Sequence, residues 1–98
     1  MGVQDDAAQI FADALSKRTG RVGMAYAMEP SVWVQGHEDA KMFFTVDGMG
    51  DLLVKFVRAG QRPVRVGFLP IAGGADALVD YLLEQIDDES GESPTVKR

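Results

Sequence analysis

The segments expected to form strands are apolar on both of their faces, and this constrains the fold more than any other feature. In residues 21–28 bulky side chains alternate with small apolar ones, and in residues 41–46 Met42 and Phe44 alternate with Phe43. A sheet that is covered on one side only alternates apolar with polar side chains. Both faces of this sheet are therefore expected to be covered, either by helices of the same chain or by a second chain.

Helical periodicity is found in three segments. Residues 5–18 carry apolar side chains at helical spacing, with acidic residues in the first turn and basic residues in the last, which matches the helix macrodipole. Residues 49–59 follow a glycine turn, and residues 75–87 follow a second one. Alternating or short apolar runs predict strands at residues 21–28, 32–34, 41–46 and 64–71.

The elements are therefore expected in the order α-β-β-β-α-β-α. This order predicts an α/β fold of the α+β type, a two-layer sandwich with three helices on a four-stranded mixed sheet. Residues 43–56 also resemble residues 68–81, because each segment has the pattern of strand, glycine turn and helix. Two neighbouring units of this kind would give parallel strands with a right-handed crossover. The alternative is that any two strand–turn–helix units share such a pattern.

A length of 98 residues is close to the commonest size of a single domain. We expect that domain to occupy residues 1–87. Residues 88–98 contain Ser, Glu, Gly and Pro with almost nothing apolar to bury, so they are expected to form a disordered acidic tail.

The composition excludes several classes of function. The chain has no cysteine, which rules out disulfides and thiolate chemistry. No apolar run approaches the length of a membrane span and the N-terminus does not have the pattern of a signal peptide, so we expect a cytoplasmic protein without a membrane partner. The net charge of −5 argues against a nucleic-acid partner, because phosphate repels an acidic chain.

His37 is the only histidine and stands beside Glu38 and Asp39. Consecutive turn residues point in different directions, whereas a metal site needs converging ligands. A solvated turn is therefore expected here, with no metal and no cofactor. No catalytic motif is found along the chain, so the sequence does not predict an enzyme. An active site assembled from residues distant in sequence is the alternative that stays open.

Two glycine turns precede expected helices, and such turns can bind anions through free backbone N–H groups. Asp47 begins the first turn, would repel an anion there and is expected to act as a helix N-cap. The second turn, at Gly73 and Gly74, has no acidic residue before Asp76. Tight turning is the ordinary role of such glycines. Binding of a small anionic ligand at Gly73 and Gly74 is the alternative function of the chain.

Opposite charges are concentrated in separate segments. If the helices at 49–59 and 75–87 lie side by side, a basic group on the first would face an acidic group on the second. The alternative is two independent solvated faces. The groups are Lys55, Arg58 and Arg62 on one side and Asp76, Asp80, Glu84 and Asp87 on the other.

The excess of apolar surface indicates a protein partner. The apolar arc of the last helix, which includes Tyr81 and Leu83, is wider than one packing face needs. Trp33, with Val32 and Val34 beside it on a short strand, is the expected anchor of the contact, because tryptophan is enriched at interface hot spots. The alternative is that Trp33 simply covers the core.

These observations predict a non-enzymatic protein–protein interaction module, such as a small adaptor, an inhibitor or a chaperone-like protein. A homodimer is expected, because a two-fold contact is the commonest way to cover an exposed apolar patch. In element order alone the chain resembles small acidic secretion chaperones, which pair helices with a sheet and dimerise.

Overall fold

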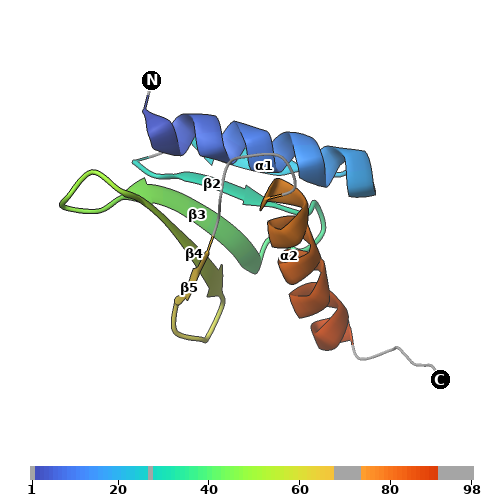
Figure 1. Cartoon of the computed structure of the whole chain (residues 1–98). Coiled ribbons are helices and arrows are strands. Elements are labelled where there is room, and N and C mark those ends of the chain that lie inside the picture. Colours follow the sequence, from blue (N-terminus) through green and yellow to red (C-terminus); the bar gives the residue numbers. More distant parts are fainter. Residues whose placement is uncertain (1, 27, 68–73, 91–98) are drawn as a thin grey trace.

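The computed structural model describes residues 2–26, 28–67 and 74–90. Along this part of the chain an N-terminal helix is followed by a run of strands and then by a second helix (Figure 1). The fold class is therefore α+β, as expected. The elements are α1 Val3–Thr19, β1 Gly23–Tyr26, β2 Pro30–Trp33, β3 Ala40–Val46, β4 Leu52–Arg58, β5 Val64–Val66 and α2 Gly74–Ser90.

The strands form one five-stranded sheet in the order β1-β2-β3-β4-β5, so each strand lies beside its neighbour in sequence. All four pairings are antiparallel. β3 and β4 pair over seven residues and form the centre of the sheet, whereas β1 and β5 are its edges. The β3–β4 hairpin projects from the end of the sheet that is remote from α2 (Figure 1).

The first helix was predicted correctly, with slightly wider bounds than residues 5–18. Asp5 accepts a hydrogen bond from the backbone N–H of Gly2 (3.2 Å), which begins the helix. Gly20 ends it with φ of 70° and donates its N–H to the carbonyl of Ser16 (2.8 Å). A left-handed residue after the last turn favours glycine, so the stop signal in the sequence acts as expected.

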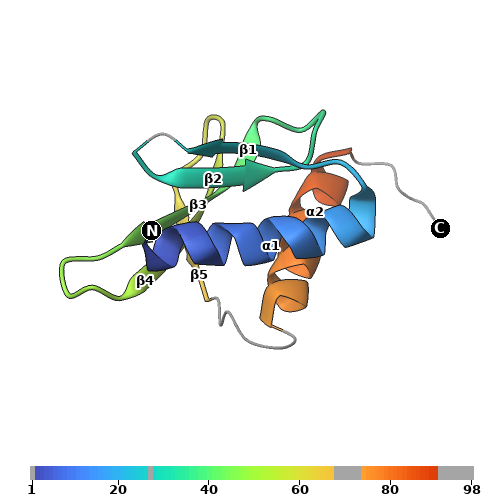
Figure 2. The same cartoon turned by 90° about the horizontal axis from the view of Figure 1, so that it is seen from above.

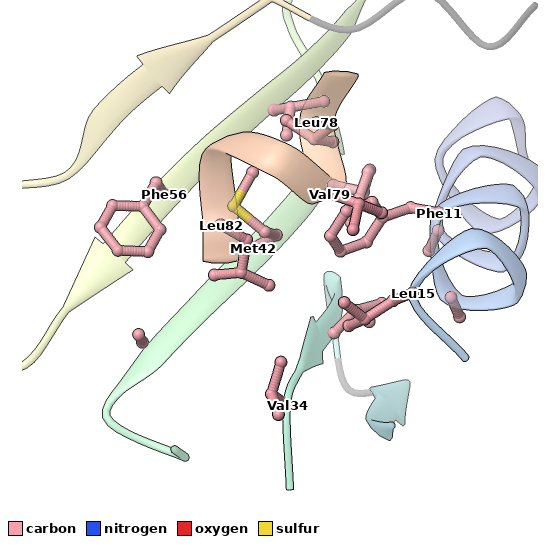
Figure 3. Packing of buried hydrophobic residues seen from close by; sticks show 14 of the residues in the cluster. Phe11, Leu15, Val34, Met42, Phe56, Leu78, Val79 and Leu82 are labelled. Atoms are coloured by element: carbon pink, nitrogen blue, oxygen red, sulfur yellow. The ribbon is translucent and has the colours of Figure 1, made fainter. Parts of the chain in front are cut away.

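Both helices pack on the same face of the sheet and cross each other there (Figure 2). Phe11 of α1 lies 5.7 Å from Phe44 of β3 between ring centroids, and Tyr81 of α2 meets Phe56 of β4 edge-on at 5.6 Å. Figure 3 shows side chains from both helices and from the strands pointing toward one another in a single cluster. The buried core therefore uses only one of the two sheet faces.

Residues 49–59, expected to form a helix, instead contain strand β4, so that prediction was wrong. All seven residues of β4 pair with β3. Val54 and Phe56 point into the core, with exposed fractions of 2% and 4%. The apolar residues of this segment satisfy a period of two as well as a helical period, and pairing with the long strand β3 decides between them.

Asp47 closes the β3–β4 hairpin and is not a helix N-cap. Its Oδ1 accepts hydrogen bonds from the backbone N–H groups of Met49 (2.9 Å) and Asp51 (3.0 Å). Gly50 has φ of 86°, a left-handed conformation that favours glycine. Aspartate satisfies free N–H groups at helix starts and in turns alike, which is why the sequence suggested the wrong element.

Asp47 should make the stability of the domain depend on pH in the acid range. Hydrogen bonds from the N–H groups of Asp51 and Met49 hold its pKa below the ordinary value of 3.8. Because the folded pKa is the lower one, the stabilisation is complete above about pH 4 and is lost as the pH falls through the folded pKa. Thermal unfolding followed by circular dichroism should show that Asp47→Ala lowers Tm near neutral pH, with a smaller difference at about pH 3. An equal difference at both pH values would contradict this account.

The rest of the expected topology also needs correction. Instead of three helices on a four-stranded mixed sheet, the described residues form two helices on a five-stranded antiparallel sheet. The expected strand 64–71 corresponds to β5, and residues 68–71 lie outside the described part of the chain. The expected helix 75–87 is α2, which continues to Ser90. Residues 91–98 of the expected tail are likewise outside the description.

The resemblance between residues 43–56 and 68–81 does not correspond to a structural repeat in the residues that can be compared. Residues 52–56 are part of β4, whereas residues 77–81 are part of α2. Without a helix between β3 and β5 there is no parallel crossover, and a short hairpin connects β3 to β4 instead.

Candidate functional site

The second face of the sheet has none of the described elements packed on it. Side chains alternate along a strand, so the neighbours of core residues point to this second face. Trp33, Phe43, Leu53 and Val57 lie there and are partly exposed. Among described residues, none of these four belongs to the core cluster or to the partly buried side chains packed against it. We call this surface the open face; its residues are Gly23, Ala25, Ser31, Trp33, Lys41, Phe43, Thr45, Leu53, Lys55, Val57 and Arg65.

A diagonal apolar stripe, formed by Trp33, Phe43 and Leu53, crosses the open face from β2 over β3 to β4. Trp33 lies opposite Lys41, two residues before Phe43. Leu53 lies opposite Thr45, two residues after Phe43. With strands about 4.8 Å apart and a rise of about 3.3 Å per residue, the apolar stripe is about 16 Å long.

Basic residues run beside the apolar stripe on its β5 side. Lys41 lies directly opposite Trp33, and Lys55 lies directly opposite Phe43. Arg65 of β5 is in turn opposite Lys55. We call these three cations the basic flank. On the β1 side the neighbours of the apolar stripe are uncharged: Gly23, Ser31 and Thr45.

The indole of Trp33 is held in place by residues on both neighbouring strands. Gly23 lies opposite it on β1, and a Cβ atom at residue 23 would clash with Nε1 and Cε2 of the indole. Glycine is therefore required for Trp33 to lie over β1. On the other side, Nζ of Lys41 lies 4.6 Å from the ring centroid, which is a cation–π contact.

Charge is divided unevenly between sheet and helices. The described strands contain no acidic residue, although the whole chain has a net charge of −5. Their charged residues are Lys41, Lys55, Arg58 and Arg65. By contrast, α2 contains no basic residue and has as its acids Asp76, Asp80, Glu84, Asp87, Asp88 and Glu89.

Of the two alternatives left open for the charged segments, the pairing of a basic helix with an acidic helix does not occur, because residues 49–59 are not helical. Lys55 points to the open face, away from α2. Arg58 contacts α2 through a hydrogen bond from its guanidinium to the carbonyl oxygen of Gln85. Asp80 pairs with Arg18 of α1 at 2.5 Å. Both of these side chains are largely exposed, so the ion pair contributes little to stability.

Of the five residues predicted to bind a partner, only Trp33 lies on the open face. Val32 and Val34 are in the core, with exposed fractions of 0% and 1%, and we remove them from the predicted contact. They flank Trp33 in sequence and therefore point to the opposite face. Tyr81 and Leu83 are partly buried on α2 and pack against the core.

Phe43, Leu53 and Lys41 were not predicted as surface residues of one site. The alternation along residues 41–46 already separated Phe43 from its core neighbours. Leu53 was assigned to the buried side of a helix that does not form. Their proximity to Trp33 depends on the register of three strands, which the sequence alone does not give.

His37 lies in the turn between β2 and β3, as expected. Its backbone N–H donates to the carbonyl of Val34 (2.8 Å), and its own carbonyl accepts from Ala40 (3.1 Å). The Glu38 carboxylate accepts from the N–H of Gly36 (3.2 Å). Among the side chains of residues 2–26, 28–67 and 74–86, no group of His, Cys, Asp and Glu is arranged to hold a metal ion.

The alternative anion site is only partly within the described chain. Gly73 lies outside it, and Gly74 is the first residue of α2. Asp76 follows in the first turn of that helix and is exposed. Anion binding at this position stays a prediction from the sequence.

Neither described helix is long and apolar enough to cross a membrane. Both helices carry charged residues along their length. The open face must be interpreted from its own geometry, because no family model, no curated protein and no solved structure matches this chain.

Proposed function

We propose that this protein is a non-enzymatic protein–protein interaction module that binds its partner through the open face. The observation that carries the proposal is the apolar stripe of Trp33, Phe43 and Leu53 on a sheet face with no described element over it. Contiguous apolar surface with a polar rim is a common mark of a protein contact. Tryptophan is also the side chain most enriched among residues that dominate binding energy.

The open face is a preformed surface. The apolar stripe comes from β2, β3 and β4, each paired on both sides. Trp33 is held between Gly23 and Lys41 before any partner arrives. A partner therefore does not have to order the backbone on binding, which removes one of the main entropic costs of association.

The chemistry of the open face suits binding better than catalysis. Its polar side chains are lysine, arginine, serine and threonine, without a carboxylate or a histidine among these strand residues. Ser31 is 4% exposed, and its neighbours across the strands are Ala25 and Phe43, not a base. General acid–base catalysis needs a proton donor and acceptor placed together. An adaptor, an inhibitor or a chaperone-like protein needs only a surface that binds its partner, without acid or base groups.

Site-specific photo-cross-linking in cells of the source tests the proposal. A benzoylphenylalanine introduced in place of Phe43 should cross-link to one defined protein. The same group in place of Ile10, a partly exposed apolar residue of α1, should not. Trp33→Ala should reduce the cross-link at position 43 at least about tenfold, because hot-spot tryptophans contribute about 2 kcal/mol or more.

The outcome separates a true contact from random capture. Products that form equally from positions 43 and 10, or that persist unchanged in Trp33→Ala, would contradict the proposal. A product between two copies of the chain would identify the partner as a homodimer. Circular dichroism of each variant is the control that the fold is intact.

A further inference from the structure

We infer that the partner presents an acidic amphipathic α-helix of about three turns to the open face. The apolar side of that helix lies along the apolar stripe, and its carboxylates face the basic flank. This inference rests on the proposed function and names the kind of partner that the same surface takes.

The position of the apolar stripe favours a helix over an extended segment. The stripe crosses β2, β3 and β4, whose backbone groups are already paired on both sides. A strand from a partner could add only at the edges, β1 or β5, which the apolar stripe does not reach. A helix satisfies its own backbone hydrogen bonds and can cover a sheet face. A stripe about 16 Å long matches about eleven helical residues at 1.5 Å per residue.

The basic flank requires negative charge on the occupant. Lys41 and Lys55 are partly buried beside Trp33 and Phe43, so a covering surface would remove much of their remaining water. A cation that loses water without gaining a partner is costly. The described strands offer no carboxylate to pair with Lys41 and Lys55, whereas Arg65 already interacts with the Asp47 carboxylate of the β3–β4 turn. Carboxylates along one side of the bound helix would both pair these charges and fix its orientation.

A second copy of this chain fits the open face poorly. A two-fold contact through this surface would bring two copies of Lys41, Lys55 and Arg65 together, and like charges in an interface are unfavourable. The acidic helix α2 of a second copy would match the charge. Its apolar residues Leu78 and Leu82, however, are already buried against its own sheet.

Single-stranded nucleic acid also carries negative charge, but its bases need free aromatic faces for stacking. The Trp33 ring is already occupied by Lys41 on one side and lies over Gly23 on β1. Phe43 is the remaining ring of the apolar stripe, and Leu53 and Val57 on β4 offer none, so successive bases would find no row of aromatic side chains. The net charge of −5 further weakens long-range attraction of a polyanion.

Selection from a phage-displayed library of helical peptides, randomised at their surface positions, tests the inference on the full chain. The enriched peptides should be acidic and should carry apolar residues at i, i+3, i+4 and i+7 spacing. Synthetic copies are then titrated against wild type, Lys55→Glu, Trp33→Ala and the control Lys17→Glu, with fluorescence anisotropy as the readout. Lys17 is an exposed lysine on α1, so its variant makes the same change in net charge away from the open face.

Lys55→Glu should weaken peptide binding at least about tenfold, whereas Lys17→Glu should change it less than about twofold. When the glutamates of the peptide are changed to lysine one at a time, one of these changes, at the glutamate that faces residue 55, should restore binding to Lys55→Glu. Where circular dichroism shows that Lys55→Glu is not folded, Lys55→Gln replaces it and should weaken binding in the same direction.

Each alternative has its own outcome. Peptides that bind through Trp33 but show no acidic bias and no dependence on Lys55 would overturn this inference and leave the proposed function standing. Peptides whose binding depends on neither Trp33 nor Lys55 would overturn this inference and the proposed function together. Tighter, Lys55-dependent binding of an oligothymidylate, or a dimer in sedimentation equilibrium that Trp33→Ala dissociates, would replace the helix with nucleic acid or with a second copy.

Discussion

Val54→Asp should unfold the domain at neutral pH. Val54 is 2% exposed on β4 and belongs to the core cluster under the two helices. Aspartate at this position removes apolar burial and places a carboxylate among apolar side chains. Substitutions of this kind cost more than about 4 kcal/mol, a large part of the roughly 5–15 kcal/mol that stabilises a domain. Circular dichroism should therefore show loss of secondary structure or a urea midpoint close to zero.

Leu53→Asp is the matched control for this prediction, because it introduces the same charge one residue away. Leu53 is partly exposed on the open face, next to the basic flank. Its substitution should change the free energy of unfolding by about 1 kcal/mol or less. If residues 49–59 formed a helix, Leu53 would be buried and Val54 would point outward. A larger loss in the free energy of unfolding for Leu53→Asp than for Val54→Asp would thus show that β4 is not a strand.

The error at β4 shows where the sequence pattern is ambiguous. Leu52 and Phe56 belong to the buried side in either structure, since they are four residues apart and both periods include them. Among the apolar residues of this segment, only Leu53, Val54 and Val57 exchange sides between helix and strand. The β-branched side chains of Val54 and Val57 were the local hint in favour of a strand. The pairing with β3 outweighs the helical spacing, and it is not visible in the segment itself.

Elements with signals at both ends were predicted well. α1 has acidic residues at its start and Gly20 after its end, and it was placed within a few residues of its actual bounds. β3 places Met42 and Phe44, both 0% exposed in the structure, on one face, and Lys41, Phe43 and Thr45 on the other, as its sequence predicted. In these two elements the local pattern and the tertiary packing agree, so the sequence was sufficient.

The candidate site was predicted in part, through Trp33 alone. Its neighbours Val32 and Val34 were assigned to the same contact, but adjacent residues of a strand point to opposite faces. Phe43 and Leu53 join Trp33 only through the register of β2, β3 and β4. A shift of one residue in either pairing would move them to the other face. The site therefore depends on information that becomes visible only when the strands are assembled.

Phe44→Ala should chiefly reduce stability, whereas Phe43→Ala should chiefly reduce binding. Phe44 is 0% exposed and lies 5.7 Å from the ring of Phe11. Truncating a buried phenylalanine costs about 3–5 kcal/mol, because the cavity is only partly filled by relaxation. Urea unfolding should show this loss. Phe43 is the adjacent residue on the open face and is partly exposed, so Phe43→Ala should lower the free energy of unfolding by about 1 kcal/mol.

The two variants remove the same atoms and differ only in the face from which they remove them. Phe43→Ala should keep the fold and weaken binding of the helical peptides selected on the open face, measured by fluorescence anisotropy, because it removes the middle of the apolar stripe. Phe44→Ala should weaken binding only as far as it depopulates the folded state, so added osmolyte that restores the fold should restore binding. Osmolyte should not rescue Phe43→Ala. Equal stability losses in the two variants would mean that both faces of the sheet are buried, and the open face would then not exist.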